Sequence, residues 1–598
     1  MPQSSTPNDA MDVKCLEQDF QYSHEKNLWT LKKGSGEFAY SDGDESENYM
    51  LSVIQSAKDC SVMSDELSAA MKDFSSTYHL HHQRCNLLRS ISSDLKGPIL
   101  EIGAGCGVLT RFLGEQGHQV FALEGSPRRA SIIGARCRDL PNVSVIQANF
   151  QDFRVFQKFQ TITLIGVLEY ARLYFSDGGA GDPVDHTLKH VSDMLLPEGA
   201  LIVAIENQLG LKYFAGYPED HLSIAMAGVE NQYTDKSVVT FGRKTLSEKL
   251  SMAGLNHQRF AYPFPDYKFP QAVLFEDAMS GQNAHRYAPL VAGTLASDPQ
   301  KPRRQNFRMS MAIQPVMQNG LGADLANSFL ITASSSQNAI SNPTTANAVY
   351  YGNCDRKKPY LKEVRIQEDS GVLDVERRSI CKNVASDNEE ITQVLENEPF
   401  VEGTLWASEL QKLLIRTKWT LDDLTDWARV WLEALKEEAD LEADMNLSPL
   451  TKLNGSLLDA IPKNLVINPK GERRFFDLEW HTKKPLELGY LITRGLWASL
   501  LEVEYIETSR NEYDITSLIQ EVSSRLGFSM SRAEIDAYLV QEAAFQQKVF
   551  DKPSPHKKFR YIKTQTSHRS LNRREKRLRN FRRILHKLQH PVSTFFQR

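Results

Sequence analysis

Glycines and acidic residues recur at regular spacing between Glu101 and Glu124. Gly103, Gly105 and Gly107 follow Glu101 at alternate positions. A glycine turn lets the backbone approach a ligand where a side chain would clash, and the N–H groups that open the next helix face that ligand. An acid such as Glu124, at the end of the following strand, can accept both hydroxyl hydrogens of a ribose. The pattern therefore predicts a site for an adenosine-type cofactor.

Alternating strands and helices must hold this turn in place. The residue pattern predicts a helix over 110–116 and strands over 99–102, 119–123, 143–147, 161–167 and 200–205. Such alternation predicts an α/β domain with a parallel sheet that helices cover on both faces. Cofactor and substrate then belong at the carboxyl ends of the strands.

The spacing also distinguishes between cofactors. A dinucleotide fingerprint reads G-x-G-x-x-G, whereas this chain reads E-x-G-x-G-x-G. That pattern resembles motif I of class I S-adenosylmethionine (SAM) methyltransferases. The resemblance implies a Rossmann-like domain in which Glu124 holds the ribose of SAM. It also implies that the methionine end is held by Glu101, Gly103, Ala104, Gly105 and Gly107.

Residues after the later strands would complete such a site. By the same resemblance, Asn149 and Phe150 hold the adenine, although most members have an acid where this chain has Asn149. Glu169 and Glu206 follow the strands at 161–167 and 200–205 and would face the methyl-transfer position. Transfer to a hydroxyl needs a base, for which Glu169, Glu206 and His79 are candidates. For each of them a purely structural role stays open.

The absence of two motifs limits the chemical class of the methyl acceptor. The chain has no N-P-P-Y after the strand at 161–167, where base-amino methyltransferases place it, and no Pro-Cys dipeptide that would suggest a cytosine-C5 nucleophile. An oxygen acceptor is therefore favoured. Nucleic acid is not expected as a partner.

Five separated pieces resemble one bacterial family of SAM methyltransferases, encoded with glycosyltransferases in surface-polysaccharide clusters. The pieces are YSDGDESEN, YHLHHQRCNLLR, GVLEYA, IENQLGLKYFAG and YPFPDYKFP, in order between residues 35 and 275. The resemblance implies O-methylation of a saccharide or glycan-lipid acceptor, with glycosyltransferases of the same pathway as partners. His79, His81 and His82 allow a metal site, but within YHLHHQR they are expected to shape the substrate entrance.

A second constellation lies beyond residue 325. Asp459, Asn464 four residues further on, and Asp477 after a later strand have the layout of a kinase active site. One carboxylate accepts the proton of the acceptor hydroxyl, while the Asn and the second carboxylate hold Mg²⁺ on the phosphates. Lys362 lies on an expected strand, and 399–403 (PFVEG) resembles the hinge of small-molecule kinases.

The region 325–525 thus resembles aminoglycoside-phosphotransferase-like kinases. The resemblance implies catalysis by Asp459, ATP binding by Lys362 and Mg²⁺ ligation by Asn464 and Asp477. Two departures leave a degenerate binding module open. Leu457-Leu458 replaces the usual His-Gly, and no glycine-rich phosphate loop is evident. The combined architecture resembles the bifunctional methyltransferase–kinases that terminate bacterial O-antigen chains.

The last residues are strongly basic. Residues 551–598 hold fifteen Lys/Arg and two acids, although the chain of 598 residues carries a net charge of −5. Leu571, Leu578, Phe581, Leu585 and Leu588 fall on one face of a predicted helix. Such a helix binds an anionic membrane surface or a partner helix.

Composition completes the sequence-based expectations. Single cysteines without a C-x-x-C pair, a polar start and no long apolar run predict a cytoplasmic protein, peripheral at most at the membrane. The expected division is a poorly ordered 1–35, a helical lead-in at 36–90, a methyltransferase domain at 91–280, a linker at 281–324, a kinase-like domain at 325–525 and a helical basic tail at 526–598. The alternative function is a non-catalytic SAM-binding and pseudokinase protein that docks a glycosyltransferase complex.

Overall fold

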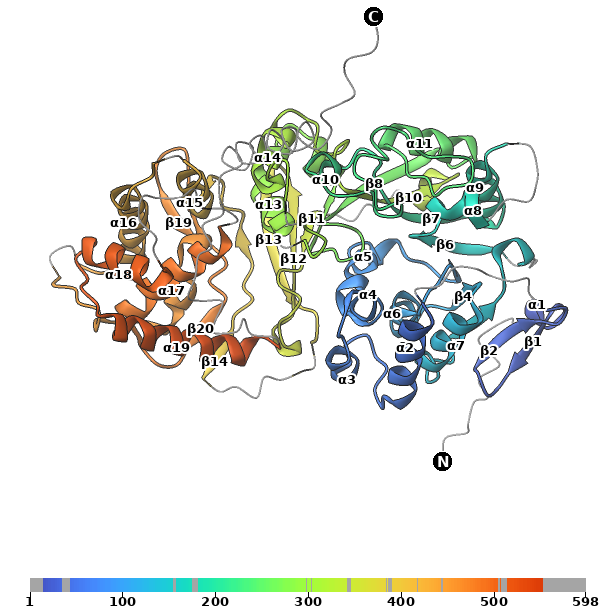
Figure 1. Ribbon diagram of the computed structural model, residues 1–598, viewed down its shortest axis with the longest axis horizontal. Helices are drawn as coiled ribbons and strands as arrows, with labels where there is room; N and C mark the ends of the chain where they lie inside the picture. The colour runs from blue at the N-terminus through green and yellow to red at the C-terminus, as the bar shows by residue number, and fades with distance from the viewer. Residues whose placement is uncertain are drawn as a thin grey trace, which may run out of the picture. The chain divides into compact units, whose positions relative to one another are not determined.

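The chain folds into two compact units (Figure 1). The first comprises residues 1–354 and 361–380, and the second comprises 355–360 and 381–598. The computed structural model describes residues 14–34, 43–153, 158–174, 181–296, 298–302, 304–340, 346–382, 384, 390–416, 418–442, 445–503, 506 and 514–551.

A parallel sheet forms the centre of the first unit and confirms the predicted Rossmann-like α/β domain. Its strands run in the order β5-β4-β3-β6-β7, and neighbours pair in parallel. They are β3 (Ile99–Ile102), β4 (Val120–Glu124), β5 (Val143–Gln147), β6 (Phe159–Ile165) and β7 (Leu195–Glu206). Successive strands β3, β4 and β5 are added on one side of β3, whereas β6 and β7 are added on its other side. This reversal of the strand order creates a crevice at the carboxyl ends of β3 and β6.

Burial explains these strands. Every residue of β3, β4 and β5 is buried, as expected for parallel strands that are covered on both faces. Helix α6 (Val108–Glu115) packs Leu109, Phe112 and Leu113 into the same core. The next helix, α7 (Pro127–Arg136), starts with proline after Ser126, whose hydroxyl accepts a hydrogen bond from the N–H of Arg129.

One strand of this sheet comes from a region that we expected to belong to the second domain. Strand β10 (Ser328–Ser334) lies antiparallel between β7 and β8 (His257–Phe264), and all of its residues are buried. The expected boundary at residue 325 is therefore wrong. A short buried strand reveals nothing in the local sequence about a partner more than a hundred residues away, so only the tertiary structure could show this pairing.

The N-terminal region also differs from its prediction as poorly ordered. Strands β1 (Phe20–Ser23) and β2 (Leu28–Leu31) form a hairpin, and β2 joins the sheet edge beside β5, with Trp29 opposite Ile146. The lead-in that follows is helical. It contains α2 (Asp44–Ser56), α3 (Asp65–Ala69), α4 (Phe74–Leu80), a 3₁₀ turn at His82–Cys85 and α5 (Asn86–Arg89).

Antiparallel strands extend the other side of the sheet beyond β8. They are β9 (Ala272–Phe275), β11 (Ala346–Tyr350), β12 (Lys362–Asp369) and β13 (Val372–Ser379). The remaining α-helices of this unit are α1 (Lys14–Glu17), α8 (Ala171–Tyr174), α9 (Pro183–Asp193), α10 (Leu211–Phe214), α11 (Arg243–Met252), α12 (Glu276–Ser280), α13 (Ala288–Ala296) and α14 (Met309–Gln318).

The second unit is mainly helical around a core that includes Trp431 and Trp497. Its helices are α15 (Trp406–Leu414), α16 (Leu421–Glu438), α17 (Leu488–Glu502), α18 (Ile515–Arg525) and α19 (Arg532–Val549). Short strands include β14 (Ile391–Gln393), β16 (Thr404–Leu405), β17 (Lys452–Leu453), β18 (Leu465–Ile467), β19 (Arg473–Phe475), β20 (Trp480–Thr482) and β21 (Leu486–Glu487).

The second unit extends beyond residue 526, where the basic tail was expected to begin. Helix α19 buries Ile535 and Val549 in the core of the second unit, so it belongs to this unit rather than to a tail. The predicted amphipathic helix around 571–588 lies outside the described residues.

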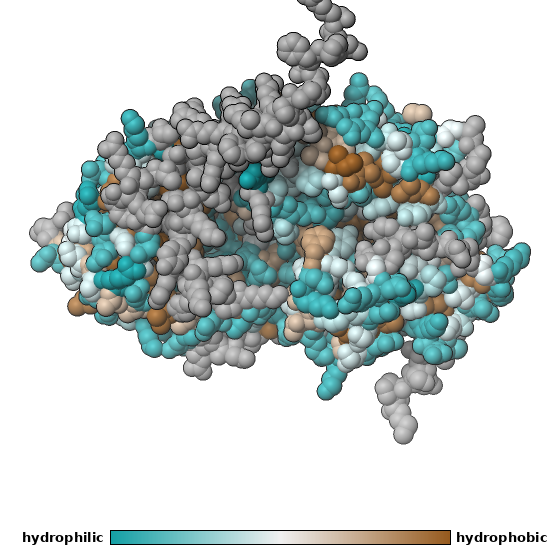
Figure 2. All heavy atoms as spheres, viewed as in Figure 1, coloured by the Kyte–Doolittle hydropathy of each residue, from teal (hydrophilic) through white to brown (hydrophobic). Residues whose placement is uncertain are grey.

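Hydrophilic side chains cover much of the described surface in Figure 2, with apolar ones in small groups. Among the large apolar residues that are exposed are Ile224 and Met252. Within the described ranges, no helix combines the length and the apolar character that a membrane span requires.

Candidate active site

A cavity lies at the carboxyl ends of β3 to β6, where the order of the strands reverses. The glycine turn after β3, Glu124 at the end of β4, Asn149 after β5 and Val167 after β6 line it. The structure thus brings together residues of three strand ends that the sequence predicted as a cofactor site, and Val167 adds a fourth that was not predicted.

The glycine turn has a left-handed backbone at Gly103, Gly105 and Gly107, with φ of 71°, 60° and 76°. A β-carbon on Gly103 would lie 2.5 Å from a methyl carbon of Val167, so glycine is required there for packing. A β-carbon on Gly105 would instead meet only the His79 ring, at 3.9 Å. Because Gly105 lines the cavity, this free space is available to a ligand.

Glu124 holds the turn from its far side. Its carboxylate accepts hydrogen bonds from the N–H of Gly105 at 2.8 Å and from the N–H of Ser126 at 2.9 Å. Burial raises the pKa of Glu124, whereas Arg129 and the two backbone hydrogen bonds lower it. A carboxylate has about four lone-pair positions, so Glu124 can shape the turn and still accept hydrogen bonds from a ribose.

Glu101 is tied into the protein rather than free. The hydroxyl of Thr110 donates a hydrogen bond of 2.6 Å to its carboxylate, and burial raises the pKa of Glu101 to about 7. Ala104 and Gly107 belong to the same turn. Ala104 lines the cavity, and Gly107 precedes helix α6 and packs against Ile133.

The adenine end of the predicted site has an unused acceptor. The side-chain oxygen of Asn149 is buried, and no described residue donates a hydrogen bond to it. The exocyclic amine of adenine is a donor that would complete this atom. Phe150 supplies a buried ring beside Asn149, so the residues present fit SAM.

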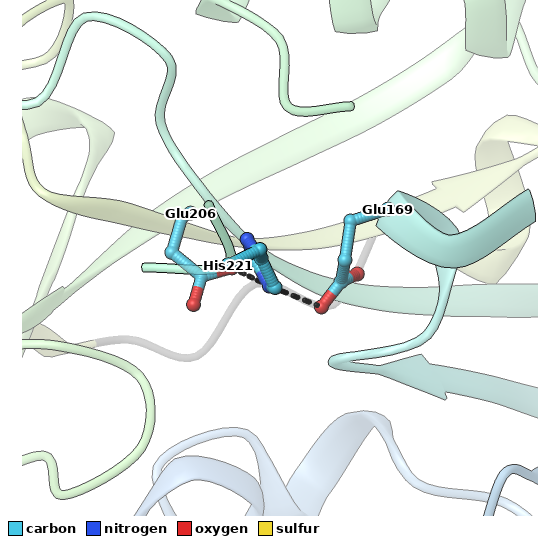
Figure 3. Close-up of side chains that lie close together, drawn as sticks. All are labelled: Glu169, Glu206 and His221. Atoms are coloured by element: carbon cyan, nitrogen blue, oxygen red, sulfur yellow. Dashed lines mark ion pairs between the residues drawn. The ribbon is translucent and has the colours of Figure 1, made fainter. Parts of the chain in front are cut away.

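Three acid and imidazole side chains meet beside this cavity (Figure 3). Glu169 follows β6, Glu206 ends β7, and His221 lies in the loop after α10. The His221 Nε2 atom lies 3.7 Å from Glu169 Oε1 and 3.9 Å from Glu206 Oε2. The edge of the Tyr170 ring, which lines the cavity, contacts the His221 ring at a centroid distance of 5.4 Å.

The His221 loop is fixed by Glu219. The Glu219 carboxylate accepts hydrogen bonds from the N–H of His221 and of Leu222, at 2.8 and 2.6 Å, and contacts His221 Nδ1 at 3.0 Å. Burial lowers the pKa of His221, but Glu206, Glu169 and Glu219 raise it more, to about 11. Burial raises the pKa of Glu169.

The buried Lys212 and the partly buried Lys268 flank the cluster. Lys268 forms ion pairs with Glu206 Oε1, with Asp220 at 3.0 Å and with Asp266 at 3.7 Å. Lys212 pairs with Asp220 and Asp266 at 2.8 and 2.7 Å. These contacts occupy Glu206 Oε1 and leave Glu206 Oε2 facing His221.

The sequence analysis found Glu169 and Glu206 but missed His221, Glu219 and Lys268. A usable signal was the acid, acid, histidine run at 219–221. His79 takes another place, because its ring lies against the glycine turn and its carbonyl accepts a hydrogen bond from Arg136. The rings of His81 and His82 lie 4.7 Å apart between centroids, but His81 accepts a hydrogen bond from the N–H of Gln83 and His82 contacts the carbonyl of Cys354.

In the second unit, the side-chain amide of Asn464 links the other two predicted residues, Asp459 and Asp477. Asn464 donates hydrogen bonds to the backbone carbonyls of Asp459 and Asp477, at 3.0 and 3.4 Å. The Asp459 carboxylate is buried and lies 3.1 Å from the Arg494 guanidinium, which also pairs with Glu542. Burial raises the pKa of Asp459 to about 6, against the opposing effect of Arg494. Lys362 lies instead on β12 of the first unit, where it is buried.

No family model and no curated protein matches the sequence. The solved structures that resemble part of the chain include a SAM-dependent methyltransferase from Thermotoga maritima, with 16% identity over 42% of this chain and 89% of that one and a TM-score of 0.24. The CcbJ methyltransferase from Streptomyces caelestis has 15% identity over 31% and 83%, with a TM-score of 0.24. The glycopeptide N-methyltransferase MtfA, in complex with sinefungin, has 13% identity over 42% and 94%, with a TM-score of 0.24. These neighbours are methyltransferases, and each resembles less than half of this chain.

Proposed function

We propose that the first unit is a SAM-dependent methyltransferase that methylates an oxygen of a saccharide or glycan intermediate. The observation that carries this proposal is the position of the Glu169–His221–Glu206 cluster beside the cavity of the glycine turn. One site would hold the methyl donor, and the other would hold and activate the acceptor.

The roles of the residues follow from their contacts. SAM supplies a methyl group on a sulfonium sulfur, which keeps the electron pair of the breaking C–S bond while the C–O bond forms. Glu124 would accept the ribose hydroxyls, and Asn149 would accept a hydrogen bond from the adenine amine. Glu169 and Glu206 are buried carboxylates, and Glu169 is the better placed to take the proton of an acceptor hydroxyl, because Glu206 is held in an ion pair with Lys268. A carboxylate whose pKa is raised by burial, such as Glu169, is a stronger base than an exposed one.

The saccharide acceptor rests on the resemblance of the five sequence pieces to the surface-polysaccharide family. Mass spectrometry of the surface glycan from cells with and without the intact gene tests it. We expect one methyl group to be lost when the gene is removed and to return with the wild-type gene but not with a Glu169→Gln variant. A labelled methyl group found only in protein or nucleic acid would refute the saccharide acceptor.

A nucleotide site in the second unit is a second candidate, supported by the Asn464 amide that joins the backbones of Asp459 and Asp477. The ion pair between Asp459 and Arg494 favours a binding module over an active kinase, because a base held in such a pair is less available to a hydroxyl. Titration of the full chain with ATP and Mg²⁺ tests binding, and the Asp477→Asn variant should weaken it. Phosphate transfer to the glycan would support the bifunctional enzyme instead.

The basic residues 552–598 remain a proposed contact to an anionic membrane surface, at the inner face of the cytoplasmic membrane. Each Lys or Arg near such a surface contributes about 1 kcal/mol. Flotation of the full chain and of a chain ending at Lys552 with anionic liposomes, at low and high salt, tests this role. Equal flotation of both chains would refute it.

A further inference from the structure

We propose that Glu169, Glu206 and His221 form a binding site for one divalent first-row metal ion, which would hold an oxygen of the acceptor. The three side chains each offer a ligand atom, and these atoms lie within 4.8 Å of one another (Figure 3). The catalytic use of this ion rests on the proposed methyltransferase function, whereas its binding does not.

The distances are those of ligands around an ion rather than of direct hydrogen bonds. A ring N–H donates to oxygen at about 2.7–3.2 Å, but His221 Nε2 lies 3.7 and 3.9 Å from the two carboxylates. Two atoms at such separations can both lie about 2.0–2.2 Å from an ion between them, which is the usual range for nitrogen and oxygen ligands of zinc.

The carboxylates also have unused ligand atoms. Glu169 Oε2 and Glu206 Oε2 are buried, and no described residue donates a hydrogen bond to either. The side chains of Glu169 and Glu206 are 1% and 0% exposed. A buried carboxylate oxygen without a partner costs free energy. An ion at the centre of the cluster would satisfy Glu206 Oε2, which faces His221, and would contact Glu169 through Oε1, the oxygen of that carboxylate that faces His221.

Glu219 gives His221 the orientation of a metal ligand. Its carboxylate lies 3.0 Å from His221 Nδ1, so the Nδ1 proton donates to Glu219, and the ion would displace the proton on Nε2, the atom that faces Glu169 and Glu206. Histidines that bind metals commonly donate their other ring N–H to a carboxylate in this way. Glu219 is therefore a positioning residue.

The surrounding charge favours a cation. When ionised, five carboxylates here face three cations, Lys212, Lys268 and His221, and leave an excess of two negative charges; the carboxylates are Glu169, Glu206, Glu219, Asp220 and Asp266. Lys268 binds Glu206 on Oε1, so it leaves Oε2 available to the ion. Two carboxylates and one imidazole suit Mn²⁺, Fe²⁺ or Zn²⁺.

Such an ion would change the role of the two carboxylates. A bound divalent ion polarises an acceptor oxygen and lowers the pKa of its proton. Glu169 and Glu206 would then act as ligands, and the proton of the acceptor hydroxyl would pass to water before the methyl group is transferred.

The test uses the purified full chain after removal of metals with a chelator. Mn²⁺ alone is titrated by electron paramagnetic resonance, and SAM binding is measured separately by calorimetry. We expect one Mn²⁺ per chain, more than about tenfold weaker binding in Glu169→Gln and His221→Asn, and about 10–100-fold weaker binding in Glu219→Gln. Glu198→Gln, an exposed acid on β7, is the matched control and should bind like the wild type.

A nitrogen coupling in the pulsed spectrum of wild-type Mn²⁺ should report His221 as a ligand, even where a variant fails to fold. The absence of this coupling, or equal Mn²⁺ binding by a folded Glu169→Gln variant, would overturn the proposed site. Wild-type protein that binds SAM but neither Mn²⁺ nor Zn²⁺ would overturn the metal site and leave the proposed function intact. Failure of the wild type to bind SAM would refute the proposed function alone.

Discussion

The glycine turn offers a matched pair of substitutions that separates a cofactor site from a merely structural loop. Gly105 and Gly117 both have a left-handed backbone, with φ of 60° and 84°. A β-carbon on Gly117 would meet nothing within 4 Å, and one on Gly105 only the His79 ring at 3.9 Å. Substitution to alanine should therefore cost both variants the same backbone strain, about 1–2 kcal/mol.

Only Gly105 lines the cavity, so only its added methyl group would meet SAM. Forcing one extra methyl group into a filled site costs about 1–3 kcal/mol, which corresponds to roughly a 5- to 150-fold loss of affinity. We expect Gly105→Ala to lose SAM affinity by this factor and Gly117→Ala to keep it.

Calorimetric titration with SAM measures both affinities, and thermal unfolding checks that the two variants are destabilised alike. Unchanged SAM affinity in a folded Gly105→Ala protein would refute the assignment of the cavity to SAM. Equal losses in both variants would show that strain, rather than contact with the cofactor, explains the effect.

Three further predictions concern buried charges. Glu124→Gln keeps one of the two acceptor oxygens that bind the N–H groups of Gly105 and Ser126 and removes the charge, so SAM should bind about 1.5–3 kcal/mol more weakly by calorimetry. Full affinity would contradict the ribose role. The pKa of Glu101 is raised to about 7, so the folded state holds its proton longer than the unfolded state as pH rises from about 4.5. The wild type therefore loses stability as the pH rises toward 7. Between pH 4.5 and 8, the free energy of unfolding of Glu101→Gln should rise by about 3 kcal/mol relative to that of the wild type. A difference that stays constant with pH would contradict this. Arg494→Met leaves Asp459 and Glu542 buried without their cation, so the second unit should lose about 3–5 kcal/mol of stability, measured by its thermal transition, and no loss would show that the pair is not buried in solution.

The sequence determined the parts of the first unit that depend on local pattern. Strands with continuous apolar runs are recognisable because both faces of a parallel strand are buried, and β3 has the limits that its sequence predicts. The glycine turn could also be predicted from the local sequence, because left-handed backbone positions favour glycine. The role of Asn149 at an adenine was predicted only through the family resemblance.

Tertiary structure decided what depends on distant partners. Strand β10 enters the sheet between β7 and β8 through backbone hydrogen bonds, which its own sequence does not encode. The Glu169–Glu206–His221 cluster also depends on distant partners. Glu169 and Glu206 could be expected near each other from their strand ends, but His221 reaches them through a loop that Glu219 fixes. Likewise, Asp459 has the spacing of a catalytic base, and only the fold reveals Arg494 beside it. The sequence shows which residue types are present and how they are spaced. The charges around each of them come from residues that are far away in sequence.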